Sequence, residues 1–389
     1  MVAPFMPDEE KLAAVREALP AVGAGIYLNT PSAGPMPAET AKAMADVAAS
    51  ELTLGRAHPD QALDALERSG EARAGVAAIL GTDVDSVGLI HSETDAVVLL
   101  ELLAGPNARE RSAVLIDPSP AVEALIKGYG HAVVHVPADR DDAAILRQFE
   151  AAIATGCGLV VIPHVSPSSG TVLPVAGIAE LAHAKGALVA VDGSQAVGAM
   201  PFDLEASGAD VYRVAAETWL LGPQGIGAVW CTSGVLDRAR AIVPGSFGTG
   251  EVDHHRPVLV GFARSCGWLS MYVGLEWIQG RGAAVARLAA DRLARIPGVV
   301  LLTPTDRMAT VLSFKVRGWS AEAALDELGA RAFAIASTVP ALDAIRIGVG
   351  FFNSEVEIER FAQAVELIAA HTPETLPPRR TLTILHAGQ

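Results

Sequence analysis

The segment Ala-Leu-Val-Ala-Val-Asp-Gly-Ser-Gln-Ala-Val-Gly at residues 187–198 decides the fold. Its apolar run, Leu188–Val191, is short and continuous, as in a strand buried on both faces, and it ends at Asp192. Similar runs at 114–116, 132–136 and 159–162 are each followed by a helix-like segment, at 121–128, 141–155 and 175–185. The alternation predicts an open α/β domain with a mostly parallel sheet. In such sheets ligands bind beyond the carboxyl ends of the strands, where Asp192 stands.

The alternation stops after Trp230, and a different pattern follows. A Leu/Ala-rich stretch at 258–295 predicts one long helix. Beyond it we expect strands at 310–316 and 344–349 and helices at 320–328 and 355–371, which together form a smaller α+β domain. We therefore expect an N-terminal segment (1–20) that packs on the small domain, a large α/β domain (21–250) and a small domain with its connecting helix (251–389).

Composition narrows the function. The 389 residues are 51% hydrophobic, which excludes general disorder, and 29 Lys and Arg against 44 Asp and Glu give a net charge of -15. Such a charge repels nucleic acid and anionic membrane surfaces, so neither is an expected partner. Three separated cysteines indicate neither a disulfide framework nor a metal site. With no signal peptide or long apolar run, we expect a cytoplasmic protein.

Several ordered motifs resemble those of the class V aminotransferases, the cysteine desulfurase, isopenicillin N epimerase and C–S lyase branch of the fold-type I pyridoxal 5'-phosphate (PLP) enzymes. They lie at 164–175, 187–198, 208–212 and 219–227, and the resemblance extends from 27–35 to 346–353. It implies the fold-type I architecture, in which a large, doubly wound, mostly parallel sheet domain is joined to a smaller α+β C-terminal domain.

Five residues correspond to the cofactor site of that family. A buried carboxylate at Asp192 requires a cation or several donors, and the resemblance implies the protonated PLP ring nitrogen as that cation. Gln195 resembles the residue that hydrogen-bonds the ring's phenolic oxygen or the neighbouring Schiff base. Ser92, Glu93 and Thr94 occupy the turn that holds the cofactor phosphate at a helix N-terminus, where the Glu93 carboxylate is out of place. The alternative is that these polar residues only cap local turns.

Arg346 matches the family arginine that binds the substrate α-carboxylate. A guanidinium on a largely apolar strand needs an anionic partner, so a carboxylate ligand or a structural salt bridge explains it. Asn29 and Ser32 resemble the N-terminal segment that borders the substrate. The implied ligand is a small molecule with a carboxylate.

The chain departs from the family at its catalytic lysine. Ala215-Ala-Glu-Thr-Trp-Leu-Leu-Gly-Pro223 has Thr218 where relatives carry the lysine that forms a Schiff base with PLP, and Ala215 and Glu217 stand for the family Ser and His. The five lysines of the chain all lie elsewhere, at Lys11, Lys42, Lys127, Lys185 and Lys315. Threonine forms no imine, so Glu217 and His164 become the nearest candidate proton carriers.

Three functions are consistent with these residues. The first is an enzyme that acts on an amino acid or amino-acid conjugate with PLP or pyridoxamine phosphate bound non-covalently. The second is a PLP-independent enzyme that uses a rebuilt cleft for acid/base chemistry, and the third is an inert partner subunit. The resemblance also implies a homodimer, in which the 246–257 loop and the 262–266 strip reach the neighbouring subunit.

Overall fold

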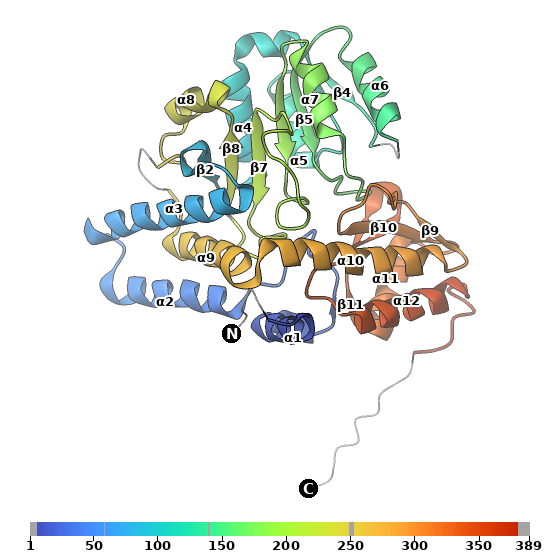
Figure 1. Cartoon of the computed structure of the whole chain (residues 1–389). Coiled ribbons are helices and arrows are strands. Elements are labelled where there is room, and N and C mark those ends of the chain that lie inside the picture. The colour runs from blue at the N-terminus through green and yellow to red at the C-terminus, as the bar shows by residue number, and fades with distance from the viewer. Residues whose placement is uncertain (1–5, 58, 139–140, 249–252, 380–389) are drawn as a thin grey trace.

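The structure is a computed structural model that describes residues 6–57, 59–138, 141–248 and 253–379. Its centre is a seven-stranded sheet with the order β2-β8-β7-β6-β5-β3-β4 (Figure 1). β8 runs antiparallel to both of its neighbours, and the other strands run in one direction. The strands are β2 (Val87–Ile90), β3 (Ser112–Leu115), β4 (Val133–His135), β5 (Cys157–Pro163), β6 (Leu188–Asp192), β7 (Val211–Ala215) and β8 (Gly227–Cys231).

Helices cover both faces of this sheet. One face packs on α3, α6, α7 and α9, and the other on α4, α5 and α8. Because helices cover both faces, β5 and residues 188–191 of β6 are continuously apolar and show no polar alternation. The helices of this part of the chain are α1 (Asp8–Ala18), α2 (Ala38–Leu54), α3 (Pro59–Leu80), α4 (Glu93–Ala104), α5 (Pro120–Gly128), α6 (Asp142–Ala152), α7 (Val175–His183), α8 (Ser233–Ile242) and α9 (Arg256–Gly267).

A second core surrounds an antiparallel sheet with the order β12-β13-β10-β9. A Ser354–Glu357 capping box starts α12, which packs on α10 and α11 beside this sheet. The two-stranded β1-β11 sheet adds Ile26 to the same core. The elements are β1 (Ile26–Tyr27), β9 (Val299–Leu301), β10 (Val311–Val316), β11 (Ala334–Ile335), β12 (Ser337–Val339), β13 (Ala344–Gly348), α10 (Leu275–Ala294), α11 (Ala321–Ala332) and α12 (Glu355–Ala369).

The prediction of one long helix at 258–295 was wrong. The chain forms α9, a π-helical turn η4 (Trp268–Val273) and α10, with a bend of 83° at Gly274. Gly274 has φ 91°, a left-handed value that favours glycine, so the helix can end there. Phe262 of α9 and Trp268 of η4 belong to the first core, and so does Ile278 in the first turn of α10, whereas Val285 belongs to the second. The chain thus passes from one core to the other within α10, just after the bend.

The core clusters also bear on the domain boundaries. α9 follows residue 250 but lies in the first core. Ile26 precedes residue 250 but lies in the second core. Arg16 of α1 pairs with Glu357 of α12 at 2.8 Å. The division at 20 and 250 therefore stays a prediction.

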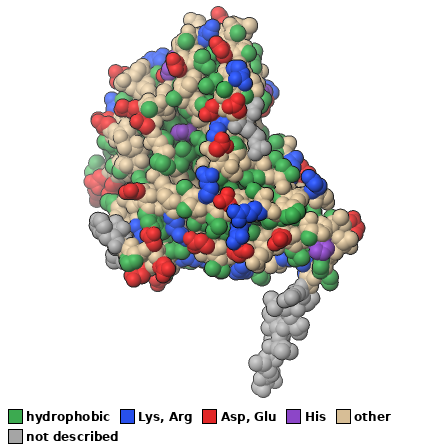
Figure 2. All heavy atoms as spheres, turned by 45° about the vertical axis from the view of Figure 1, so that its right-hand side comes forward, with side chains coloured by type: hydrophobic (Ala, Val, Ile, Leu, Met, Phe, Trp, Pro, Cys, Tyr) green, Lys and Arg blue, Asp and Glu red, His purple; other side chains and the backbone are tan. Residues whose placement is uncertain are grey.

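Two surface properties complete the fold. Acidic and basic side chains are interspersed on the face seen in Figure 2, with apolar side chains between them. Over the described residues, no individual helix has the length and apolar composition to span a membrane, and only the bent pair 256–273 and 275–294 passes that test together.

Candidate active site

A cavity of about 220 Å³ lies at the carboxyl edge of the large sheet. It is smaller than the usual 300–1,000 Å³ of sites for drug-sized ligands, so its size suits a small metabolite. The loops that follow β3, β5, β6 and β7 meet β13 of the small domain around it. Its polar lining consists of Ser32, Glu93, Asp117, Ser119, Asp192, Ser194, Gln195, Arg213, Glu217, Thr218 and Arg346.

Asp192 has a cationic partner within the chain, which is Arg213. The two residues are register partners on the adjacent parallel strands β6 and β7, and Arg213 Nη1 lies 2.9 Å from Asp192 Oδ1. The Ser194 N–H and hydroxyl also donate to this carboxylate, and the N–H does so at 2.9 Å. Burial by itself lowers the pKa of Arg213, but the charges of Asp192 and Glu93 offset it and raise that pKa overall.

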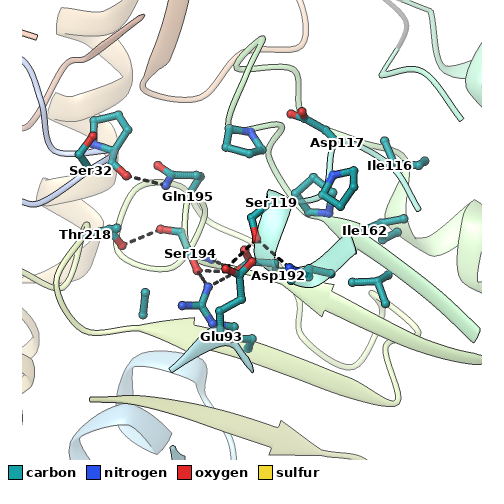
Figure 3. A pocket seen from close by; sticks show the side chains of 18 of the residues that line it. Ser32, Glu93, Ile116, Asp117, Ser119, Ile162, Asp192, Ser194, Gln195 and Thr218 are labelled. Carbon is teal, nitrogen blue, oxygen red and sulfur yellow. Dashed lines mark hydrogen bonds and ion pairs between the residues drawn. The ribbon is translucent and has the colours of Figure 1, made fainter. Parts of the chain in front are cut away.

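Glu93 brings a second carboxylate to the same place from the start of α4. Ser119 Oγ donates to its Oε2 at 2.9 Å, and Figure 3 shows Glu93, Ser119, Asp192 and Ser194 converging. Burial, and then the negative charge of Asp192, raises the pKa of Glu93. A carboxyl group with these neighbours holds its proton to a higher pH than an exposed glutamate does.

Glu217 is the third carboxylate of this cluster. It lines the cavity, and its charge acts on both Glu93 and Arg213. Among the described residues, no hydrogen bond or ion pair engages its carboxylate. Glu217 is therefore available to accept a proton from, or to bind, a cationic group of a ligand.

Arg346 lies on β13 at the other end of the cavity. Its Nη2 donates to Ser32 Oγ at 2.9 Å, its Nε to Ser337 Oγ at 3.1 Å and its Nη1 to the Pro167 carbonyl at 3.1 Å. Burial lowers the pKa of Arg346, and Asp117 acts in the opposite direction. Within the part of the chain that the structure describes, no carboxylate forms a salt bridge with it. The structural salt bridge left open by the sequence is thus not seen.

Asp117 orders the loop that holds Arg346. It adopts a left-handed φ of 44° at the end of β3. Its carboxylate accepts from Ser166 Oγ at 2.6 Å, from the Ser168 N–H at 3.0 Å and from Ser168 Oγ at 2.7 Å. The Pro167 carbonyl between those serines is the acceptor for Arg346, so Asp117 positions the guanidinium through the loop.

Gln195 and Thr218 line the cavity, but their polar atoms are used by the protein. The Gln195 amide donates to the Pro31 carbonyl at 3.0 Å and accepts from Trp219 Nε1 at 2.9 Å. Thr218 Oγ1 donates to the Ser194 carbonyl at 2.7 Å. Both side chains therefore hold the loops of the site together, Gln195 through its amide and Thr218 through its hydroxyl.

The expected phosphate turn makes hydrogen bonds within the chain, and the roles expected of Ser92 and Thr94 stay predictions. Ser92 Oγ bonds Thr94 Oγ1 at 2.7 Å and donates to Asp95 at 3.2 Å. Asp95 also accepts from the His91 N–H at 2.9 Å. Neither Ser92 nor Thr94 lines the cavity. Asn29, expected at the substrate, does not line it either, because it bridges to Gly348 in the small sheet.

His164 is also displaced from the cavity. It is buried under the sheet edge, where its Nδ1 lies 2.8 Å from the Tyr212 hydroxyl and its ring meets Phe202 edge to face. Burial lowers its pKa to about 4. A neutral imidazole packed among aromatic rings has a structural role, so the expectation that His164 carries a proton is corrected.

His164 should make stability depend on pH. Its folded pKa lies below the unfolded value of about 6.5, so between those values only the unfolded chain binds the proton. The free energy of unfolding should therefore fall by about 3 kcal/mol through this residue as the pH drops from 6.5 to 4. Urea unfolding of parent and His164→Gln at several pH values tests this, because the variant should show a flatter decline. Parallel curves for parent and His164→Gln would contradict the prediction.

The residues present do not fit PLP held as the resemblance implies. No lysine lines the cavity, and Asp192 already has the cation that the ring would supply. The N-terminus of α4 is occupied by the carboxylates of Glu93 and Asp95, and these repel a phosphate. The same objection holds for pyridoxamine phosphate. Among the described residues, no group of three or more His, Cys, Asp or Glu side chains is arranged to bind a metal ion.

Arg213 is the functional residue that sequence reasoning missed. A signal was present, because an arginine interrupts the otherwise apolar run 211–215. The carboxylate that needed a cation was already identified at Asp192. What the sequence lacked was the register of β6 against β7, which brings the two side chains together across 21 positions.

Comparisons with known proteins agree with this fold. A probable cysteine desulfurase of Mycolicibacterium paratuberculosis is 29% identical over 81% of this chain and 51% of its own length. A cysteine desulfurase of Cereibacter sphaeroides is 31% identical over 61% of this chain and 62% of its own length. The chain thus spans about half to two thirds of these relatives. A probable cysteine desulfurase of Methanothermobacter thermautotrophicus is 23% identical over 94% of this chain and 99% of its own length.

Solved structures show the same architecture. A C-DES mutant with glycine covalently linked to its PLP cofactor superposes with a TM-score of 0.79 at 17% identity, over 90% of this chain and 98% of that one. The apo cysteine desulfurase of Thermococcus onnurineus has a TM-score of 0.76 at 19% identity, over 95% and 100%. The family model of the class V aminotransferases matches residues 26–361. The chain belongs to the class V aminotransferase family and has its fold-type I architecture.

Proposed function

We propose that this chain is an enzyme that binds a small amino acid or amino-acid conjugate in the cavity and acts on it by acid/base chemistry, without a PLP Schiff base. One observation carries the proposal: Arg346 faces the cavity with hydrogen bonds to Ser32, Ser337 and Pro167 but without a carboxylate partner. A ligand carboxylate supplies that partner, and its two oxygens match the planar guanidinium.

The opposite end of the cavity supports an amino group on the same ligand. Glu93, Asp192 and Glu217 surround the single guanidinium of Arg213, so this end carries more carboxylates than cations. Their environments differ: Asp192 is paired with Arg213, and burial raises the pKa of Glu93. Neighbouring carboxyl groups in different environments are the usual arrangement of an acid and a base. In this proposal Glu93 donates a proton and Glu217 accepts one.

Ligand binding tests the carboxylate site. Isothermal titration of PLP-free protein with a panel of amino acids and their carboxamides should give binding only with the free carboxylates. Arg346→Lys keeps the charge but loses the planar pair of donors, so affinity should fall by about 1–3 kcal/mol with little change in stability. Equal binding of acids and amides, or unchanged affinity in Arg346→Lys, would contradict the proposed substrate class.

We also propose a homodimer, and the expected contact strip stays a prediction. Within 262–266, Phe262 and Cys266 are buried in the core, whereas Arg264 is exposed and is the residue of the strip that faces outward. Within the expected loop at 246–257, residues 249–252 lie outside the described residues. Exposed apolar side chains also lie on α2, α3 and η4, where Leu52, Leu63 and Met271 are 88%, 63% and 65% exposed. α2 and α3 both pack on α9, and α3, α9 and η4 line one hollow that includes Arg264 and Met271.

A second copy of the chain is the proposed cover for this surface. Light scattering should give twice the chain mass. The dimer interface should bury more than about 2,000 Å², as is typical of obligate dimers. Met271→Glu, which places a charge in the contact, should raise the dimer dissociation constant. Glu366→Lys on α12 serves as a control that changes charge elsewhere. A monomer at working concentration would contradict the prediction.

A further inference from the structure

We propose that Arg213 determines the cofactor specificity of this cavity: it supplies to Asp192, from within the chain, the cation that a protonated PLP ring brings in the relatives, and so excludes PLP. The inference deepens the proposed function, because it explains how a PLP fold is left with a cofactor-free site. The role of Arg213 follows from its position in the cavity, beside Asp192.

The first step is the competition for one carboxylate. Arg213 Nη1 donates to Asp192 Oδ1 at 2.9 Å, and Ser194 binds the same oxygen. The two partner residues project from adjacent strands toward the face that α4 covers. A ring nitrogen that approached Asp192 would have to displace a guanidinium already bound there.

The second step is that the displaced guanidinium has no suitable alternative position. The arginine side chain is only 15% exposed, and its Nε is buried without a hydrogen-bond partner among the described residues. Below the pair, the space between α4 and the sheet is lined by apolar side chains such as Ala96, Val97 and Leu100. Moving a charge into that space without a partner is costly. The ion pair is therefore the stable state, and PLP binding would carry the full free-energy cost of breaking it.

The third step is that the charge around the pair favours the guanidinium over the cofactor. Glu93 and Glu217 also act on Arg213 and raise its pKa. The guanidinium is a pure cation, whereas PLP also carries a phosphate, and the carboxylates of Glu93 and Asp95 at the start of α4 repel a phosphate. Arg213 thus fits the negative cluster, and the cofactor does not.

The experiment compares PLP binding in parent, Thr218→Lys, Arg213→Ala and the double variant Arg213→Ala/Thr218→Lys. Equilibrium dialysis gives the affinity, absorbance reports the imine, and borohydride reduction with mass spectrometry locates it. In the double variant the new amine and the PLP aldehyde condense with loss of water. We expect no retained PLP in parent or Thr218→Lys, and at least about 100-fold tighter binding in the double variant, with the adduct at residue 218. Arg147→Ala/Thr218→Lys, which removes an exposed arginine on α6, should behave as Thr218→Lys.

Several outcomes overturn the proposal. Arg213 is not the determinant if Thr218→Lys alone binds PLP as tightly as the double variant. Circular dichroism identifies which variants fold, and Arg213→Gln, which keeps a donor for Asp192 but loses the charge, is tested beside Arg213→Ala. The proposal is wrong if neither Arg213→Ala nor Arg213→Gln, each combined with Thr218→Lys, binds PLP more tightly than Thr218→Lys alone. Amino-acid titration of the parent separates the two hypotheses, because loss of carboxylate binding contradicts the proposed function and leaves the PLP comparison intact.

Discussion

Asp192→Ala should lower the free energy of unfolding by about 3–5 kcal/mol, because it leaves the Arg213 guanidinium buried without its partner. The Asp192 side chain is 29% exposed and Glu93 remains near Arg213, so we expect the lower end of that range. Urea unfolding at neutral pH measures the change. An exposed pair gives the control: Lys42 and Asp46 are 73% and 64% exposed, and Asp46→Ala should change stability by less than about 1 kcal/mol.

The double variant Asp192→Ala/Arg213→Met distinguishes a lost pair from a stranded charge. Replacing both members of a buried pair by apolar side chains is often neutral, whereas removing one is costly. The double variant should therefore recover most of the stability that Asp192→Ala loses. If the single variant unfolds within about 1 kcal/mol of the parent, the pair is weaker than its geometry indicates.

Local pattern was enough for the strands that surround the site. The apolar runs at 114–116, 159–162 and 188–191 correspond to β3, β5 and β6, because a strand buried on both faces leaves a continuous hydrophobic signature. The direction of β8 was not predictable. Its residues 227–231 are as apolar as the parallel strands, and only the pairing of β8 with β2 and β7 sets its orientation.

The candidate site was predictable one residue at a time but not as an arrangement. The need of Asp192 for a cation followed from its place after a buried strand, and Glu93 was already out of place in a phosphate turn. Both are explained by Arg213, which reaches them through sheet register and helix packing. His164 shows the opposite case, since its position after β5 suggested the cavity and its side chain turns to Tyr212. Side-chain direction at a strand end is decided by packing, which the sequence does not display.

Glu217→Gln should lower kcat by about 10²–10⁴-fold while leaving substrate binding largely intact, because it removes the proposed base and keeps the shape of the side chain. The amino acid that binds most tightly in the titration panel is the substrate for this test, and proton NMR follows its consumption. Binding rests mainly on Arg346 at the other end of the cavity, so the effect should fall on kcat and not on KM.

The pH profile gives this prediction a second readout. In the parent, activity should fall at high pH as Glu93, whose pKa is raised by burial and by Asp192, loses the proton that it donates. Glu93→Gln should lose this falling limb, whereas Glu217→Gln should keep it at a lower kcat. The matched control is Glu150→Gln, a change at an exposed position of α6 that should preserve both kcat and the falling limb. An unchanged kcat in Glu217→Gln would remove Glu217 from the chemistry and leave the cavity as a binding site.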